Sequence, residues 1–161
     1  MSPRSAAPAR AASGHDHDAC VARALESAEA VCRAQGARLT SNRRRVLEII
    51  WRNHDVMGAY EILEIMQRDE PRTKPPTVYR ALEFLQEQGL VHRIESSNAF
   101  TRCEAPLEHA HCQFLVCDEC GRVEEVHSDT LARLLGDTAR EQAFEPRRFT
   151  IEVRGTCRRC A

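Results

Sequence analysis

Two pairs of cysteines in the C-terminal part of the chain have the spacing of zinc ligands. Cys117 and Cys120 form one Cys-x-x-Cys motif, and Cys157 and Cys160 form another. Four thiolates match the tetrahedral coordination of zinc at structural sites, where no coordination position stays open. The alternative is two redox dithiols or unrelated cysteines, but paired motifs in a short domain favour metal. We therefore predict a structural zinc held by these four residues.

A second group of metal-ligating residue types lies between the two parts of the chain. It consists of imidazoles, one thiol and one carboxylate: His92, Cys103, His109, His111, Glu125 and His127. A mixed set of nitrogen, sulfur and oxygen ligands suits zinc. Each residue alone has a simpler interpretation, such as a solvated histidine or a buried cysteine. Together they surround a hinge, so a metal that joined its two sides would fix the angle between them and act as a switch.

Three further cysteines receive no role from the sequence. Cys20 and Cys32 fall on the first predicted helix, where burial as small apolar residues is the usual outcome. Cys112 stands next to His111, where it could compete as a ligand, and it is assigned no role.

The elements before Cys103 have the order of a winged helix-turn-helix. Apolar residues at helical spacing predict helices over about 20–35, 41–52, 59–69 and 75–88. Two alternating segments, 90–94 and 99–103, flank Ser96, Ser97 and Asn98 and predict a hairpin. In a winged helix-turn-helix the last helix enters the DNA major groove and the hairpin lies along the backbone.

The elements after Cys103 predict a small α+β domain. Strands are expected at 113–116, 123–126 and 147–153, with a helix that starts after Ser128 and continues to about Ala143. The apolar residues available for its core are few: Phe114, Val116, Val123, Leu131, Leu134, Phe149 and Ile151. A domain with such a thin core needs a metal or a partner to fold stably.

We therefore predict an α+β protein in four parts. Residues 1–18 form a disordered tail, 19–103 a winged-helix DNA-binding domain, 104–108 a hinge, and 109–161 a zinc-binding dimerisation domain. Residues 37–102 carry a slight excess of basic side chains and 103–161 an excess of acidic ones, which fits one part that faces phosphate and another that holds cations.

The composition excludes several classes of protein. The chain is 42% hydrophobic and 29% charged, and no apolar run is long enough for a membrane span. The first residues lack the apolar core of an export signal, so we expect a cytoplasmic protein in which the cysteines bind metal instead of forming disulfides. None of the motifs HExxH, GxSxG or a glycine-rich phosphate loop is present, and we predict no enzymatic activity.

One segment resembles a known family almost residue for residue. The segment is Lys74-Pro75-Pro76-Thr77-Val78-Tyr79-Arg80-Ala81-Leu82-Glu83-Phe84-Leu85, followed by Glu87-Gln88-Gly89-Leu90-Val91-His92-Arg93-Ile94-Glu95-Ser96. It is similar to the ferric uptake regulator superfamily, and most closely to its zinc uptake regulator branch. The resemblance extends from about Ala28 to Cys160 and leaves the N-terminal tail unmatched.

The resemblance implies a homodimeric repressor that binds palindromic operator DNA of zinc-uptake genes with Zn²⁺ as corepressor. It also implies two zinc ions per chain. The structural zinc would be held by the four cysteines named above, and the sensing zinc by His92, Cys103, His111 and Glu125. His109 is the alternative to His111, and His109 with His127 are candidates for a third site.

For DNA, the resemblance points to the fourth helix and its surroundings. The residues implied are Tyr60, Lys74, Thr77, Tyr79 and Arg80. Arginine reads guanine edges through two hydrogen bonds, tyrosine packs on a thymine methyl or bonds to phosphate, and a helix N-terminus favours an anion. Arg43, Arg44 and Arg45 either contact the DNA backbone or form a solvated helix face.

Three other functions remain open at this point. A regulator of the same superfamily that senses iron, manganese or peroxide has the same scaffold, although the thiol of Cys103 favours the softer zinc. A zinc-buffering protein would not need the DNA-binding residues. A zinc hydrolase is the most distant alternative, because a zinc near Glu125 can in principle activate water.

Overall fold

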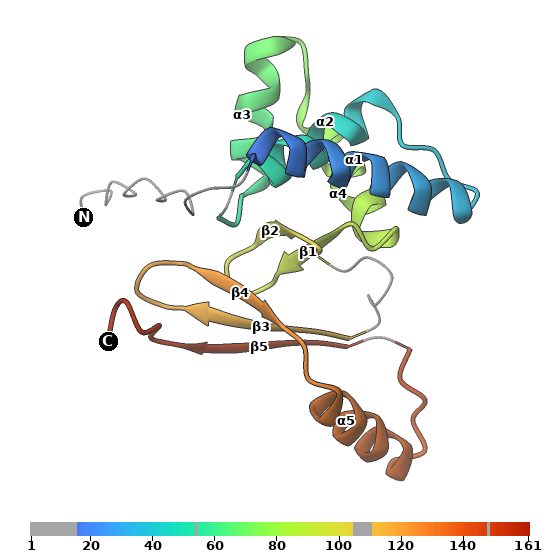
Figure 1. Ribbon diagram of the computed structural model, residues 1–161, viewed down its shortest axis with the longest axis vertical. Coiled ribbons are helices and arrows are strands. Elements are labelled where there is room, and N and C mark those ends of the chain that lie inside the picture. The colour runs from blue at the N-terminus through green and yellow to red at the C-terminus, as the bar shows by residue number, and fades with distance from the viewer. Residues whose placement is uncertain (1–15, 54, 105–110, 148) are drawn as a thin grey trace.

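The computed structural model of the chain describes residues 16–53, 55–104, 111–147 and 149–161. Within these residues the fold is α+β, as predicted, with helices that precede a two-stranded hairpin and a three-stranded sheet (Figure 1). The elements in chain order are α1 (His17–Ala34), α2 (Ser41–Arg52), α3 (Ala59–Asp69), α4 (Pro75–Glu87), β1 (Val91–Ile94), β2 (Ala99–Arg102), β3 (His111–Cys117), β4 (Val123–Val126), α5 (Asp129–Glu141) and β5 (Phe149–Gly155).

We call α1–α4 with the hairpin β1–β2 the winged half, and β3 to β5 with α5 the sheet half. α1 begins at His17, inside the segment predicted as a tail. The predicted hinge 104–108 lies, apart from Glu104, outside the described residues. None of the helices that the structure describes is both long and apolar enough to cross a membrane.

Local sequence explains where the helices of the winged half begin. The carboxylate of Asp16 accepts a hydrogen bond from the backbone N–H of Ala19 at 3.1 Å and caps α1. At α3, Glu61 in the first turn accepts from the backbone N–H of Gly58 at 2.6 Å. α4 opens on two prolines, which a first turn tolerates because its N–H groups have no partner within the helix.

The core of the winged half is formed by the apolar stripes of its helices. The side chains exposed by less than 2% include Val46, Leu47, Ile50, Ile62, Val78, Leu82 and Leu85. Each buried aliphatic side chain of this size contributes about 1.5–3 kcal/mol. The stripe predicted for α4, Val78, Leu82 and Leu85, is confirmed as buried. This packing leaves the opposite side of α4 facing outward.

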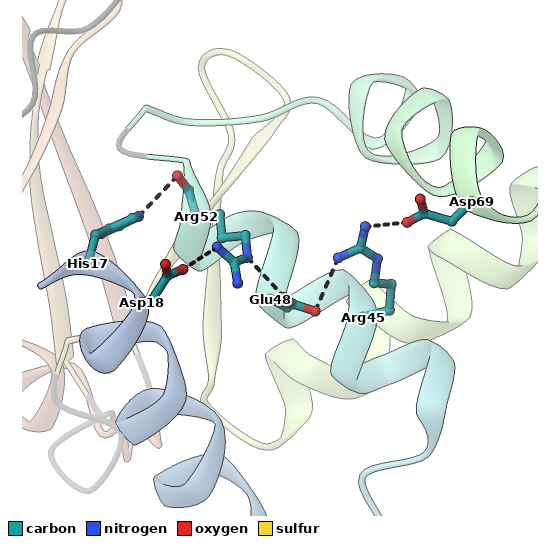
Figure 2. Close-up of polar contacts among 6 residues, drawn as sticks. All are labelled: His17, Asp18, Arg45, Glu48, Arg52 and Asp69. Carbon is teal, nitrogen blue, oxygen red and sulfur yellow. Dashed lines mark hydrogen bonds and ion pairs between the residues drawn. The ribbon is translucent and has the colours of Figure 1, made fainter.

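A polar network joins the first three helices (Figure 2). Its members are His17, Asp18, Arg45, Glu48, Arg52 and Asp69. Arg52 of α2 donates to Asp18 of α1 at 2.7 Å and to Glu48 at 2.9 Å, and Arg45 bonds to Glu48 and to Asp69 of α3. Partial burial opposes ionisation of Glu48, but hydrogen bonds from Arg52 and Arg45 outweigh it and hold its pKa below the ordinary value.

The sheet half is built on the strand order β4-β3-β5. β3 pairs with β4 antiparallel and with β5 parallel, and the parallel register aligns Cys117 with Gly155. Parallel pairing brings the C-terminal ends of β3 and β5 to the same edge of the sheet. The two cysteine motifs therefore start side by side.

The prediction of a core position is wrong for one residue, which is exposed in the single chain. Leu134 was expected inside the sheet half, but it is 60% exposed on α5. The reason is that α5 lies beyond the end of the sheet, at the far end of the molecule from α1–α4, instead of across a sheet face (Figure 1). Phe114 and Val116 are buried as predicted, and Phe149 and Ile151 are half-buried.

The wing hairpin lies between the helices and the sheet (Figure 1). Ile94 of β1 is fully buried against Cys112, Phe114 and Val116 of β3. The two halves thus share an apolar contact along the wing. The distances between groups on the two sides of this contact depend on the relative position of the halves.

Candidate functional site

The four cysteines of the two Cys-x-x-Cys motifs lie together at the edge of the sheet. Their sulfur atoms are all within 4.8 Å of one another. Cys120 Sγ lies 3.8 Å from Cys157 Sγ, and Cys157 Sγ lies 3.7 Å from Cys160 Sγ. Tetrahedral zinc with Zn–S bonds of about 2.3 Å needs sulfurs about 3.8 Å apart. The set therefore fits a zinc ion.

The turns after β3 and β5 produce this geometry. Cys117 is the last residue of β3, and its sulfur accepts a hydrogen bond from the backbone N–H of Cys157 at 3.3 Å. The turn after Cys117 closes through Gly121, whose N–H donates to the Cys117 carbonyl at 3.0 Å. Gly121 has a φ of 72°, a conformation that side chains disfavour. The motif thus needs a glycine at this position.

The thiols of this cluster have opposite pKa shifts. Backbone N–H groups, first that of Cys157 and then that of Cys120, lower the pKa of Cys117 to about 6. Hydrogen bonds with Cys157 and Cys120 raise the pKa of Cys160 to about 12. The thiolate of Cys117 is stabilised, whereas a second thiolate at Cys160 is also disfavoured by the negative charge of the first. A bound divalent cation removes the repulsion between the two charges.

A second ligand group joins the wing to the sheet. His92 Nε2 of β1 lies 3.4 Å from Glu125 Oε1 of β4 and 3.8 Å from Cys112 Sγ of β3. The three ligand atoms lie within 4.8 Å of one another. Tetrahedral zinc places nitrogen and oxygen ligands about 3.4 Å apart, and nitrogen and sulfur about 3.6 Å apart. This group also fits a zinc ion, with donors from both halves of the protein.

The surroundings hold these ligands in place. His92 is 2% exposed and its ring packs edge-on against Phe114, with the ring centroids 5.1 Å apart. Burial raises the pKa of Glu125, but the hydrogen bond and charge of His92 outweigh it, so the pKa lies below its ordinary value. The backbone N–H of Glu104 donates to Glu125 Oε2 at 3.4 Å. An ionised carboxylate thus faces the imidazole across the contact between the halves.

The structure brings together only some of the residues predicted for the sensing zinc. His92 and Glu125 meet, and Cys112, to which the sequence assigned no role, joins them. Cys103 is buried at the end of the wing, and among the described residues it belongs to neither ligand group. His111 is the first residue of β3, but its side chain and all of His109 lie outside the described part.

His127 lies beside the second ligand group, and Cys112 lies on the buried face of β3. The imidazole of His127 lies 3.9 Å from Glu125 at the margin of the second group. Cys112 has the same strand parity as Phe114 and Val116, so period-two alternation was the signal that could have placed it on the buried face of β3.

Of the residues predicted to contact DNA, Lys74, Thr77, Tyr79 and Arg80 lie at the start of α4, and Tyr60 lies in the first turn of α3. Tyr60, Lys74, Tyr79 and Arg80 are exposed, and Thr77 is half-buried. Tyr79 is 48% and Tyr60 66% exposed, unusual for aromatic side chains without a partner. The first turns of α4 therefore carry exposed aromatic and cationic side chains and a half-buried hydroxyl group.

The three consecutive arginines of α2 have partners inside the protein. Arg43 stacks on the ring of Phe84, 3.5 Å from its centroid, and donates to the carbonyl of Arg38 at 2.7 Å. Arg44 pairs with Glu29, and Arg45 belongs to the network of Figure 2. These contacts favour a structural role for all three over contact with DNA.

Comparison with known proteins agrees with this arrangement. The sequence model of the Ferric uptake regulator family matches residues 34–154. The chain belongs to the ferric uptake regulator family. It is 36% identical over 137 residues to the Zinc uptake regulation protein of Escherichia coli, an alignment that covers 84% of this chain and 80% of that protein.

Solved structures are similar over most of the chain. A zinc uptake regulator complexed with zinc and DNA matches this family member with a TM-score of 0.81 and 35% identity, covering 87% of this chain and 94% of that one. Holo XcZur matches with a TM-score of 0.76 and 37% identity, covering 84% and 95%. Apo XcZur, at 35% identity and covering 87% and 97%, matches with a TM-score of only 0.51.

Proposed function

We propose that this member of the ferric uptake regulator family is a zinc-responsive transcriptional repressor, which binds palindromic operator DNA of zinc-uptake genes with Zn²⁺ as corepressor. The observation that carries the proposal is the ligand group of His92, Cys112 and Glu125, which joins the wing to the sheet. Similarity to a zinc uptake regulator complexed with zinc and DNA supports the binding of both zinc and DNA.

Two zinc ions per chain follow from this proposal. The structural zinc is held by Cys117, Cys120, Cys157 and Cys160, whose spacing suits four thiolates. For the sensing zinc, the observed geometry supports His92 and Glu125 as ligands, and the family resemblance adds Cys103 and His111. Cys112 is a second candidate for the sulfur ligand, because its Sγ lies 3.8 Å from His92 Nε2.

We call His92, Cys112 and Glu125 the sensing group. Its position explains how metal occupancy can control DNA binding. His92 moves with the winged half, whereas Glu125 belongs to the sheet half. A metal held by both residues favours the one relative position in which their distances match its coordination. If that position is the one that fits the operator, zinc and DNA each raise the affinity for the other.

A homodimer fits a palindromic operator, since two equal half-sites need two equal reading heads. Exposed apolar side chains gather in the sheet half: Leu115 and Val153 on the sheet, Leu134 on α5 and Phe144 shortly after it. A second copy of the chain is a natural cover for such surfaces. We propose that dimerisation uses the sheet half and leaves both winged halves free for DNA.

The proposal is tested by the binding of the full chain to a labelled palindrome from a zinc-importer promoter across buffered free zinc, with iron and manganese as controls. Binding that requires zinc, with one tightly held and one exchangeable zinc per chain, is the expected result. Binding that depends on iron, manganese or peroxide would assign the protein to a sister branch. Absence of binding with every metal would leave a zinc-buffering role.

Replacement of Arg80 by alanine is expected to weaken operator binding by about tenfold to a hundredfold, because a bidentate arginine contact to a base contributes about 1–3 kcal/mol. Arg80 is exposed on α4 and makes no part of the core, so zinc content and thermal unfolding should not change. Fluorescence anisotropy with operator DNA measures the effect. Arg133→Ala on α5 is the matched control, and equal loss in both variants would disprove the role of Arg80.

A further inference from the structure

A carboxylate of the sheet half, outside the two ligand groups found among the described residues, binds the tip of the wing, residues 95–98. We propose that Glu152 is a positioning residue for operator binding: its side chain holds the wing tip against β5 and thereby fixes the orientation of the winged half. This inference rests on the proposed function, because it concerns the arrangement of the halves that binds DNA.

The contact is bidentate and involves the wing backbone. Glu152 Oε1 accepts a hydrogen bond from the backbone N–H of Glu95 at 2.6 Å, and Oε2 accepts one from the N–H of Ser96 at 3.1 Å. These two N–H groups directly follow the last residue of β1. A carboxylate with two oxygens on two adjacent amides fixes both the position and the direction of the segment.

The charge of Glu152 is favoured at this place. Burial opposes ionisation, but hydrogen bonds from the Ser96 side chain and from the N–H groups of Glu95 and Ser96 outweigh it, and Arg154 adds a favourable charge. The pKa of Glu152 is therefore below its ordinary value, so the group is an anion at neutral pH. Hydrogen bonds to an ionised acceptor are roughly twice as strong as neutral ones.

The wing tip is itself stiffened by its own side chains. Arg93 donates to Asn98 Oδ1 at 2.9 Å, across the turn, and its Nε lies 3.4 Å from Glu95 Oε2. Asn98 has a φ of 50°, a left-handed conformation that asparagine tolerates. A stiff tip transmits the constraint imposed by Glu152 to the rest of the hairpin.

The contact complements the ligand group of His92 because it lies in the turn that follows the strand of His92. In the chain, the buried residue Ile94 stands between His92 and the turn residues Glu95 and Ser96. Attachment at His92 and the apolar packing of Ile94 hold the strand, and the contact at Glu95 and Ser96 holds the turn that follows it. With strand and turn both held, metal binding at His92 selects one orientation.

The comparison structures are consistent with this role. The chain with this contact has a TM-score of 0.76 to holo XcZur and 0.51 to apo XcZur, although the two identities are 37% and 35%. It also has a TM-score of 0.81 to a zinc uptake regulator complexed with zinc and DNA. The chain that carries this contact is thus more similar overall to those two structures than to apo XcZur.

The test is Glu152→Gln in the full zinc-loaded protein, because the amide keeps the shape of the side chain but loses the charge and one acceptor. We expect operator binding at saturating zinc to weaken about tenfold, with zinc per chain and the unfolding temperature unchanged. Without DNA, hydrogen exchange of the Glu95 and Ser96 amides should become faster. Glu124→Gln on β4, an exposed carboxylate of the same sheet, should behave as wild type.

Two results would overturn the inference. Operator affinity within twofold of wild type would show that the contact does not orient the winged half, and unchanged exchange at Glu95 and Ser96 would show that it does not hold the wing tip. If the wild-type chain binds no operator at any zinc concentration, the proposed function fails as well. In that case the exchange measurement still decides whether Glu152 holds the wing.

Discussion

Replacement of Cys157 by serine should release the structural zinc and unfold the sheet half. The four sulfurs of the cluster lie within 4.8 Å of one another, so the loss of one leaves three thiols that crowd without a full coordination shell. Structural zinc contributes about 10–16 kcal/mol of apparent binding free energy, whereas a whole domain is stable by only about 5–15 kcal/mol. The thin core of the sheet half cannot compensate for this loss.

Zinc content and circular dichroism during heating measure the effect of Cys157→Ser. The expected result is one zinc fewer per chain and loss of the cooperative transition of the sheet half, while α1–α4 keep their own core. Cys20→Ser, on α1 and outside both ligand groups, is the control. A Cys157→Ser protein with normal zinc content and an unchanged transition would show that the cluster is not a structural site.

Replacement of His92 by alanine should leave a folded protein that no longer responds to zinc. Among the described residues, His92 is the ligand that the winged half contributes to the sensing group. Without it, a metal bound to the sheet half no longer holds the winged half in position. A loss of about fivefold to 150-fold in zinc-dependent operator affinity is expected, because coupling between sites is typically about 1–3 kcal/mol. Zinc at the four-cysteine site should remain.

Operator binding across buffered zinc, with sedimentation to monitor dimerisation, measures the effect of His92→Ala. His17→Ala, at the start of α1, is the control. Cys103→Ser and Cys112→Ser then identify the sulfur ligand: with cobalt in place of the sensing zinc, the variant that loses the thiolate absorption is the one that removes it. Full zinc response in His92→Ala would exclude this site as the sensor.

The sequence predicts the elements of the fold well wherever a periodic pattern meets a clear end. α4 follows from its two prolines and its stripe of Val78, Leu82 and Leu85, and β4 coincides with the predicted strand 123–126. The same reasoning fails for Leu134, because helical periodicity shows which face is apolar but not what covers it. β3 is longer than predicted by two residues at its start and one at its end, and β5 is shifted by two residues, since strand ends depend on pairing partners that local sequence does not name.

For the candidate sites, the sequence predicts groups of residues that are close in the chain. It does not predict contacts between residues that are far apart in the chain. Two Cys-x-x-Cys motifs predict their own cluster, because each motif is a local unit. The position of Cys112 beside His92 requires knowledge of how β1 faces β3. The contact of Glu152 with backbone amides leaves no pattern in the sequence, since any residue can supply an N–H group at the wing tip.

The parallel pairing of β3 with β5 also has a kinetic consequence. All of β4 and α5 lies between the paired strands, so the ends of a long chain segment must meet before this ladder forms. In the winged half, neighbouring helices and a tight hairpin supply contacts between residues close in sequence, which form faster. The winged half should thus fold ahead of the sheet half, and a newly made chain passes through a stage that has the proposed DNA-binding surface but not yet the proposed metal-sensing site.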